Sequence, residues 1–304
     1  MNNHFLEFKD ISTNDINEIT DRAIELKSGS ECDALRNLNA VLLFEKPSLR
    51  TKLGFWVGIQ KLGGNPLYFG PEEVGLGSRE SVRDVSSVIS RIADIIIIRT
   101  FEHEKIHEFS KYSSVPVINA LTDHEHPCQA LADIQTIREN LTKIKGSKIA
   151  FIGDGNNVSR SLSYALAGSG ANLVIASPNN YEIDDKTIDG ANNYAKNTGG
   201  SVTKISDPKK AVINADIIYT DVWASMGQEK EQEIRRAAFD GYQVNENLLD
   251  MASKNVKFMH DLPAHPNEEI SENLLYDERS IVFPQSENRM WSQMALIEKI
   301  IKRK

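Results

Sequence analysis

The segment AVLLFEKPSLRT, residues 40–51, joins an apolar run to a polar turn. Residues 40–44 predict a short buried strand, and the apolar positions that follow at helical spacing predict a helix. Ser48 stands at the N-cap of that helix, where its hydroxyl and the free backbone N–H groups face one point. With Arg50 and Thr51 in the first turn, this helix start is suited to bind phosphate. The alternative is a capped core helix with one exposed arginine.

Outward from this segment, short apolar runs alternate with stretches of helical periodicity. Strands that read as continuous apolar runs are typical of a parallel sheet covered by helices on both faces. At 304 residues the chain suits two domains, so the sequence predicts an α/β fold with two parallel-sheet α/β sandwiches. The predicted strands are residues 40–44, 66–69, 94–98, 116–118, 148–152, 172–176, 217–220, 256–259 and 281–283; the predicted helices include residues 14–27, 81–92 and 128–141.

Composition and charge limit the possible functions. A net charge of −8 provides no basic field for nucleic acid or anionic lipid, so any anion site must be local. The two cysteines, Cys32 and Cys128, cannot form a disulfide framework, which indicates a reducing compartment. The N-terminus lacks the pattern of a signal peptide, and no apolar run reaches the ~20 residues that cross a bilayer. We expect a cytoplasmic protein that binds neither nucleic acid nor membrane.

Polar residues follow three predicted strands of the first half. Ser48 follows the first, Arg99 another, and His126 with Gln129 a third. Because the carboxyl ends of parallel strands meet at one edge, we expect these side chains to form a ligand site there.

The second half opens like a Rossmann unit, with a strand running into Gly153-Asp-Gly155 and then a helix. The third glycine of a dinucleotide fingerprint is missing, and Asn156 and Asn157 offer side-chain amides instead, so amide contacts to a small polar ligand are favoured over a dinucleotide site. Asp221 and Asp261 also follow predicted strands, which predicts a second ligand site. Taken singly, each aspartate could instead cap a helix or pair with a surface lysine.

Together these motifs resemble those of the aspartate/ornithine carbamoyltransferase family, and its ornithine branch in particular. The resemblance spans essentially the whole chain and rests on six motifs in the family order. It implies carbamoyl-phosphate contacts from Ser48, Leu49, Arg50, Thr51, Arg99, His126, Gln129, Asp261, Leu262 and Arg289. It implies ornithine contacts from Asn157, Asp221, Ser225 and Met226, and catalytic roles for Arg50, His126, Asp261 and Arg289.

The family fold implies a carbamoyl-phosphate domain over residues 1–142 and an ornithine domain over residues 143–304, with a final helix, about 287–304, packing back on the first domain. It also implies a homotrimer, or a multiple of trimers, in which a neighbour's loop, here residues 70–83, partly closes each site. No cofactor and no metal are expected.

Two positions depart from the family pattern. Many ornithine enzymes have Gln or His in the middle of the loop where this chain has Gly75, with Arg79 as a possible substitute. The ornithine branch usually has Cys where this chain has Asp261, beside the attacking amine.

The implied reaction is attack of ornithine's neutral δ-amine on carbamoyl phosphate, giving citrulline and phosphate for arginine biosynthesis. The arginines would neutralise the leaving phosphate, His126 would donate to the carbamoyl oxygen, and Gln129 with the Leu262 carbonyl would accept from the carbamoyl NH₂. Three alternatives stay open: a carbamoyltransferase for another amine, a non-catalytic carbamoyl-phosphate or amino-acid binding protein, and a Rossmann oxidoreductase, against which the missing glycine counts.

Overall fold

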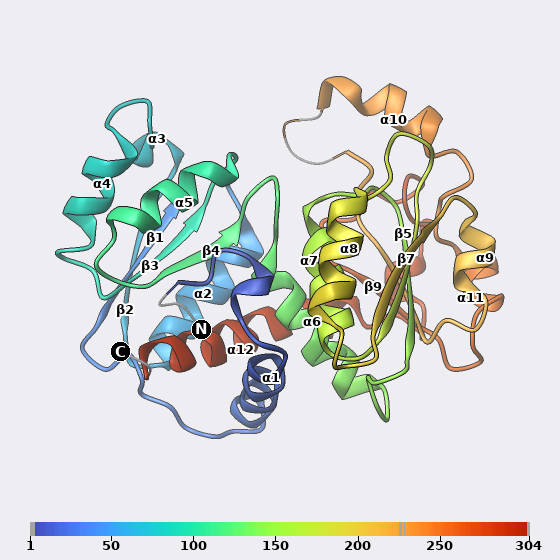
Figure 1. Ribbon diagram of the computed structural model, residues 1–304, viewed down its shortest axis with the longest axis horizontal. Coiled ribbons are helices and arrows are strands. Elements are labelled where there is room, and N and C mark those ends of the chain that lie inside the picture. The colour runs from blue at the N-terminus through green and yellow to red at the C-terminus, as the bar shows by residue number, and fades with distance from the viewer. Residues whose placement is uncertain (1–3, 225–226, 228, 303–304) are drawn as a thin grey trace. The chain divides into compact units, whose positions relative to one another are not determined.

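The computed structural model describes residues 4–224, 227 and 229–302. It divides into two compact units: unit 1 is Met1–Gln135 with Glu287–Lys304, and unit 2 is Thr136–Ser286. Each unit is a parallel β-sheet covered by helices (Figure 1), so the predicted α/β class is confirmed. The divisions fall within α6 (Pro127–Asn140) and α12 (Val282–Ile301).

The sheet of unit 1 has the strand order β2-β1-β3-β4, and all neighbouring strands run parallel. Its strands are β1 (Asn39–Phe44), β2 (Asn65–Phe69), β3 (Ile95–Arg99) and β4 (Val117–Leu121). The three strands β1, β3 and β4 are buried almost throughout, as expected of strands covered on both faces. The register pairs Phe44 with Arg99 and Arg99 with Leu121, so these strands end at one edge of the sheet.

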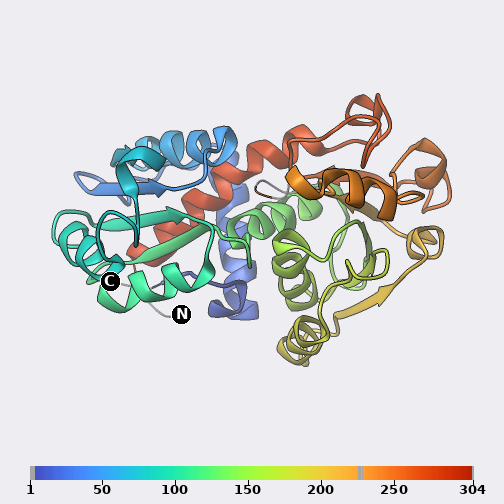
Figure 2. The same cartoon turned by 90° about the horizontal axis from the view of Figure 1, so that it is seen from above.

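Helices cover both faces of this sheet. α4 (Val82–Ile89) and α5 (His103–Tyr112) lie on one face, and α2 (Leu49–Lys61) lies on the other (Figures 1 and 2). Gly54 and Gly58 let α2 approach α12 closely, because a Cβ at Gly54 would lie 2.8 Å from Gln293 Oε1. The unit also contains η1 (Phe8–Asp10), α1 (Thr13–Lys27) and α3 (Pro71–Val74).

Unit 2 has a five-stranded parallel sheet with the order β7-β6-β5-β8-β9. Its strands are β5 (Lys148–Ile152), β6 (Asn172–Ala176), β7 (Ser201–Ile205), β8 (Ile217–Thr220) and β9 (Lys257–His260). Its helices are α7 (Asn157–Gly168), α8 (Asp185–Tyr194), α9 (Pro208–Val212), α10 (Gln232–Ala238) and α11 (Glu246–Asp250), with the short turns η2 (Glu229–Glu231) and η3 (Leu274–Tyr276). Figure 1 shows α7 and α8 on one face of the sheet and α9 and α11 on the other. Strand order reverses between β5 and β8, where open α/β sheets bind ligands.

Most predicted elements are present, and the exceptions have clear causes. The strand predicted at residues 281–283 is wrong: Val282 begins α12, and only an isolated bridge joins Phe258 to Ser280. Three apolar residues are too few to distinguish a strand from a helix start. The segment expected as a loop, residues 70–83, contains α3 and is anchored by the buried side chains of Val74 and Leu76.

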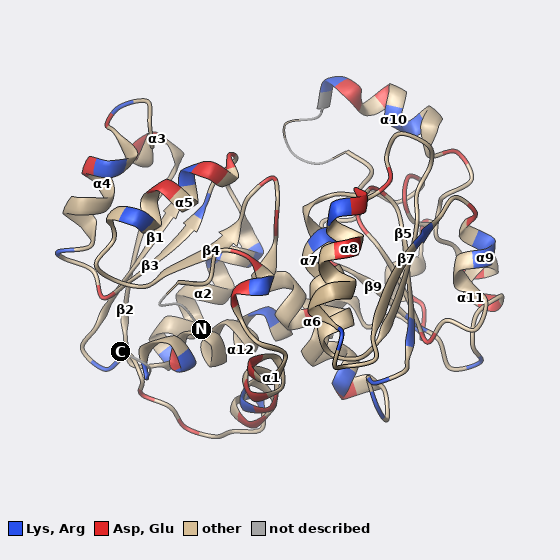
Figure 3. Cartoon of the chain, in the orientation of Figure 1, with Lys and Arg blue, Asp and Glu red and all other residues tan. Residues whose placement is uncertain are grey.

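Acidic and basic side chains are interspersed on α1, α8 and α10 (Figure 3). Within the described residues, the structure has no helix that combines the length and apolar character needed to cross a membrane.

Candidate functional site

The first cluster of polar side chains lies in unit 1, at the start of α2. Ser48 has an extended backbone and caps the helix: its Oγ accepts from Thr51 N–H (3.3 Å) and donates to Thr51 Oγ1 (2.9 Å). The side chain of Leu49 is exposed, so this residue offers the cluster only its backbone N–H. The predicted N-cap at Ser48 is confirmed.

Two guanidinium groups meet at Thr51. Arg99, at the end of β3, places Nη1 3.5 Å from Thr51 Oγ1, and Arg289 of α12 donates from Nη2 to the same oxygen. All three residues are buried. Together with Ser48, they give one hydroxyl oxygen three donors, although it has only two lone pairs. This donor-rich group of buried positive charge is suited to an anion.

Packing explains how α12 delivers Arg289 to α2. Gly54 removes the side chain that would otherwise collide with Gln293 Oε1, so the two helices approach closely there. Arg289 lies one helical turn before Gln293, as Thr51 lies about one turn before Gly54, which brings Arg289 against Thr51. Arg50 is half-buried, and its Nε finds no hydrogen-bond partner among the residues that the structure describes.

His126 and Gln129 follow β4 at the start of α6. Burial lowers the pKa of His126 well below its usual value, and the nearby charges of Arg289, Arg99 and Lys46 lower it further. The imidazole is therefore neutral at neutral pH, with one N–H donor and one acceptor. Gln129 donates from Nε2 to Asp133 (2.9 Å). This leaves its buried Oε1 without a protein donor in the described part of the chain.

The second cluster lies in unit 2, where β8 and β9 end side by side. The register pairs Thr220 with His260, so the next residues, Asp221 and Asp261, are neighbours. Asp221 accepts from Asn156 Nδ2 (2.6 Å) and from the N–H of Val222 (2.8 Å). Burial raises the pKa of Asp221 well above its usual value, and the charge of Asp261 and a hydrogen bond between the two carboxyl groups raise it further. The pair therefore tends to hold a proton.

The proton of His260 is directed away from this carboxylate pair. Its Nδ1 accepts from Leu262 N–H (2.9 Å), and its Nε2 lies 3.2 Å from Glu269 Oε1. The ring proton is thus placed on Nε2, where it faces Glu269. The Leu262–Pro263 peptide bond is cis.

The glycine turn after β5 serves packing. A Cβ on Gly155 would lie 2.3 Å from Ile183 N, and the N–H of Gly155 donates to Tyr181 O (2.8 Å). Asn156 caps α7 by accepting from Val158 N–H (3.0 Å) and the following N–H, while Asn157 is the first helical residue. Packing thus explains Gly155 without a phosphate, in keeping with the missing third glycine.

An ion pair holds the start of the segment after Asp221. Arg235 donates from Nη1 to Asp154 (2.8 Å) and to the carbonyl of Trp223 (2.9 Å). The indole of Trp223 stacks on Phe239 with ring centroids 5.5 Å apart. Ser225 and Met226, to which the family resemblance implies ornithine contacts, lie outside the described residues.

The structure brings together the predicted residues of each half: Ser48, Thr51, Arg99 and Arg289 in unit 1, and Asp221 and Asp261 in unit 2. Sequence reasoning missed Lys46, a buried cation beside His126, although it stands in the opening segment. It named Asn156 as one of two amides for a ligand but did not predict its contact with Asp221. The signal for Asn156 was its place directly before a helix, which is an N-cap position.

Comparison with known proteins agrees with this geometry. Residues 3–139 match the model of the aspartate/ornithine carbamoyltransferase carbamoyl-P binding domain, and residues 145–300 match that of the Asp/Orn binding domain. The chain is 45% identical over 296 residues to the ornithine carbamoyltransferase of Bacillus subtilis, covering 97% of this chain and 93% of the relative.

Two solved structures are also similar. The ornithine carbamoyltransferase of Pyrococcus furiosus has a TM-score of 0.92 and 42% identity, covering 96% of this chain and 95% of the other. The anabolic ornithine carbamoyltransferase of Campylobacter jejuni has a TM-score of 0.95 and 33% identity, covering 99% of both chains.

Proposed function

We propose, since this chain belongs to the aspartate/ornithine carbamoyltransferase family, that it transfers the carbamoyl group of carbamoyl phosphate to L-ornithine, giving L-citrulline and phosphate. The observation that carries the proposal is the convergence of two buried guanidinium groups on the hydroxyl of Thr51. The enzyme is a carbamoyltransferase, and the anabolic name of the Campylobacter jejuni neighbour supports a role in arginine biosynthesis.

Carbamoyl phosphate binds at the start of α2 in this proposal. Arg50, Arg99 and Arg289 neutralise its phosphate, while Ser48, Thr51 and the backbone N–H of Leu49 donate to phosphate oxygens. Each charge-assisted hydrogen bond contributes ~1.5–3 kcal/mol. Phosphate gains charge as it leaves, so donors fixed in advance at a helix start stabilise the transition state more than the ground state.

The carbamoyl group is oriented by neutral donors and acceptors. His126 donates to the carbamoyl oxygen, and its lowered pKa supports this role because a neutral ring does not repel the arginines. Gln129 Oε1 accepts from the carbamoyl NH₂, a role supported by its burial without a protein donor among the described residues. The Leu262 carbonyl is a second acceptor for this NH₂.

Ornithine is held by unit 2. Asp221 accepts from the α-ammonium group, with Asn157, Ser225 and Met226 completing the amino-acid site. Burying a carboxylate is costly unless a cation or a proton compensates it. Its raised pKa therefore supports a site that exchanges a proton for the ammonium group of the substrate.

Transfer begins when the neutral δ-amine of ornithine attacks the carbamoyl carbon. A C–N bond forms, the bond between the carbamoyl carbon and the phosphate oxygen breaks, and phosphate leaves with the electron pair. The nitrogen must then lose a proton. We assign Asp261 as the group beside the amine that accepts it, because Asp261 adjoins Asp221 at the ends of β8 and β9.

An aspartate at this position has a cost that a cysteine lacks. A carboxylate favours the ammonium form of the amine, and only the neutral amine attacks. We therefore propose that Asp261 shifts the activity optimum toward alkaline pH. The names of the relatives favour ornithine over another amine and favour an enzyme over a binding protein.

We further propose a homotrimer in which residues 70–83 contact the site of a neighbouring subunit. Exposed apolar side chains on unit 1 support association: Leu53, Leu67, Val88 and Ile92. In this segment Gly75 is left-handed (φ 47°), a backbone conformation that disfavours the Gln or His expected there, and Arg79 is exposed. The domain limits 1–142 and 143–304 and a cytoplasmic location stay predictions.

An acceptor panel tests the proposed function. The purified protein receives carbamoyl phosphate with ornithine, putrescine, N-acetylornithine, lysine or aspartate, and phosphate release is followed for each across pH 6–10. We expect ornithine to be the best acceptor, and we expect Asp261→Cys to move its optimum to lower pH. A faster reaction with another amine would overturn the assignment of ornithine, and an unchanged pH profile in Asp261→Cys would remove Asp261 from the chemistry.

A further inference from the structure

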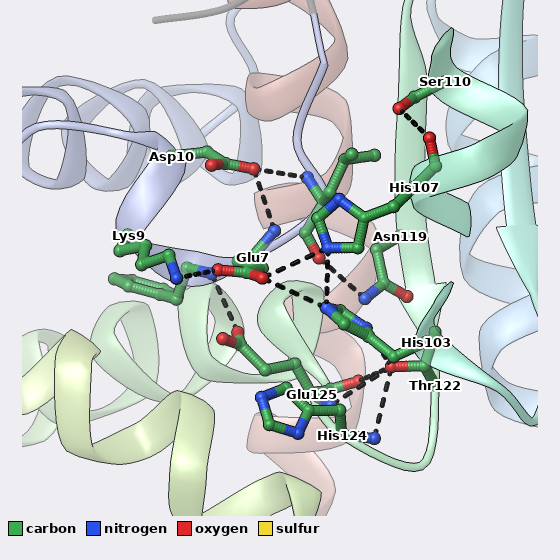
Figure 4. A network of polar contacts seen from close by, with 12 residues as sticks. Glu7, Lys9, Asp10, His103, His107, Ser110, Asn119, Thr122, His124 and Glu125 are labelled. Carbon is green, nitrogen blue, oxygen red and sulfur yellow. Dashed lines mark hydrogen bonds and ion pairs between the residues drawn. The ribbon is translucent and has the colours of Figure 1, made fainter. Parts of the chain in front are cut away.

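A second group of ligand-type side chains lies in unit 1, apart from the residues assigned to the transfer reaction. Glu7 precedes η1, while His103 and His107 lie four residues apart on α5 and so face the same side of that helix. Figure 4 shows the two imidazole rings and the Glu7 carboxylate turned toward one another. His103 Nε2 and His107 Nε2 are each 3.2 Å from Glu7 Oε1 and 3.1 Å from each other.

Hydrogen bonds alone cannot satisfy these three contacts. Each Nε2 carries at most one proton. If both rings donate to Glu7, their two N–H groups face each other. If one Nε2 carries no proton, its lone pair faces the Glu7 carboxylate, even when the other ring's N–H is shared between the two acceptors. A proton on Glu7 is disfavoured, because the ammonium group of Lys9 pairs with its carboxylate. One contact of the triangle therefore stays repulsive.

A metal ion would satisfy all three atoms at once. Zinc ligands lie ~2.0–2.1 Å from the ion in a tetrahedron, so any two of them are ~3.3–3.4 Å apart. The three observed separations of 3.1–3.2 Å are close to one face of that tetrahedron. His103 Nδ1 also lies 2.8 Å from Thr122 Oγ1, a contact that fixes the ring and leaves Nε2 free to coordinate.

We propose that Glu7, His103 and His107 form a binding site for a divalent transition-metal ion of the zinc type. Two imidazoles and one carboxylate are a common zinc set, with water as the further ligand. The side chains of Glu7 and His103 are each 12% exposed and that of His107 is 32% exposed, so His107 marks the solvent side through which an ion enters.

The site is structural, because it ties the N-terminal segment to α5. That segment is already aligned by Phe5 N–H, which donates to Val117 O (2.8 Å), and by Phe8 N–H, which donates to Glu125 Oε2 (2.8 Å). A bound ion would add a cross-link between parts of the chain about a hundred residues apart. Lys9 opposes binding, because its ammonium group pairs with the other oxygen of Glu7. The proposal thus adds a metal that the family resemblance does not imply.

Metal titration of the full chain tests this site. After treatment with a chelator and dialysis, zinc affinity is measured by competition with a chromophoric chelator, and cobalt(II) is added to read coordination from its visible absorption. We expect one equivalent of metal ion to bind per chain. Bound cobalt(II) should give the visible spectrum of a tetrahedral site, and bound zinc should raise the Tm. We expect His103→Gln, His107→Gln and Glu7→Gln each to lose at least ~10-fold in affinity for that equivalent, and Lys9→Gln to bind more tightly.

The matched control is His265→Gln, which removes a histidine from a separate group with Glu268 and Glu269. It should keep the tight equivalent and its cobalt spectrum. Because His107 is partly exposed on a helix, His107→Gln should fold, and circular dichroism checks this. The proposal is overturned if neither ion binds saturably to the wild type, or if His107→Gln folds and keeps the tight equivalent unchanged.

Discussion

Thr51 organises the cluster of side chains that we propose as an anion site. Its hydroxyl oxygen accepts hydrogen bonds from Ser48, Arg99 and Arg289. Its backbone N–H donates to Ser48 Oγ. The hydroxyl is neutral, so it positions the guanidinium groups without cancelling their charge. This leaves the charge available to a phosphate, which explains why a threonine suits the position better than an acid would.

Arg50 should be essential to turnover and dispensable for folding. It lies in the first turn of α2, is half-buried, and its Nε has no partner among the described residues. Removing one donor fixed toward developing charge costs ~10²–10³ in rate. We expect Arg50→Ala to lose that much kcat with little change in Tm. Lys52→Ala, which removes a cation of the same helix that lies over Tyr68, is the control. Turnover above about a tenth of wild type would remove Arg50 from this role.

We expect the Asp221 carboxylate to lower the stability of the fold at neutral pH and to strengthen the binding of ornithine. Its folded pKa is raised above its unfolded value, so its contribution to stability is complete below the unfolded pKa, near ~3.9, and is lost as pH rises through the folded pKa. Asp221→Asn should therefore raise Tm at neutral pH and give no gain near pH 3.5. Its amide oxygen can still accept from Val222 N–H and its NH₂ can donate to Asp261, while the bond from Asn156 Nδ2 is lost, which makes the gain in Tm smaller than the release of the buried charge alone would give. Ornithine KM should rise ~10- to 100-fold, because a charge-assisted bond is lost.

Tm measured against pH for the wild type and for Asp221→Asn checks this prediction. Asp240→Asn, at an exposed aspartate of the same unit, should leave Tm unchanged at both pH values. If Asp221→Asn is less stable than the wild type at neutral pH, the Asp221 carboxylate stabilises the fold. That result would contradict the raised pKa assigned to Asp221.

At the residue scale, the sequence predicts which residues lie at helix starts and strand ends better than it predicts which residues contact one another. Ser48 was recognisable as an N-cap because a serine before a helical pattern has few other uses. An asparagine directly before the helix indicates an N-cap, but only the structure shows that Asn156, and not Asn157, has the extended backbone of the cap. The proximity of Glu7 to His103 also required the fold, although the spacing of His103 and His107 is a visible helical pair.

At the element scale, the fold class is predicted mainly from the buried strands of the two parallel sheets. β3 is buried throughout and apolar except for Arg99 at its end, so the sequence predicts it. β7 has only one fully buried residue and several polar ones, so the sequence does not predict it. β7 lies at the sheet edge, where one side of the strand is unpaired and polar residues are tolerated. The polar residues of β7 therefore give a weaker sequence signal than the apolar run of β3.

The turn between β5 and α7 offers a test of why Gly155 is glycine. A methyl group there would meet the backbone at Ile183 N (2.3 Å) and Glu182 C (2.5 Å), and backbone atoms cannot swing aside as a side chain can. We expect Gly155→Ala to destabilise the protein by ~1–3 kcal/mol or more in urea unfolding. Gly70→Ala, where the nearest atom is 3.5 Å away, is the control. Equal stability of the two variants would contradict a packing role for Gly155.

At the scale of the whole molecule, sites shared between subunits, as we propose, require the chain to form a homotrimer. Unit 1 exposes the apolar side chains of Leu53, Leu67, Val88 and Ile92, and residues 70–83 are held in place by the buried Leu76. We expect light scattering to give three times the chain mass of 34.0 kDa. Leu53→Lys and Val88→Lys together should weaken assembly and activity in parallel. A fully active monomer would contradict shared sites between subunits.

Citrulline formation, measured together with phosphate release, tests the central claim most directly. Purified protein is incubated with carbamoyl phosphate, with and without ornithine, and Arg50→Ala is assayed beside it as the variant of low turnover; a blank without protein measures the uncatalysed reaction. The account predicts that citrulline and phosphate appear in equal amounts, only with ornithine, and that Arg50→Ala loses most of both. Phosphate release without citrulline, or no turnover from a folded wild-type protein that binds carbamoyl phosphate, would contradict it.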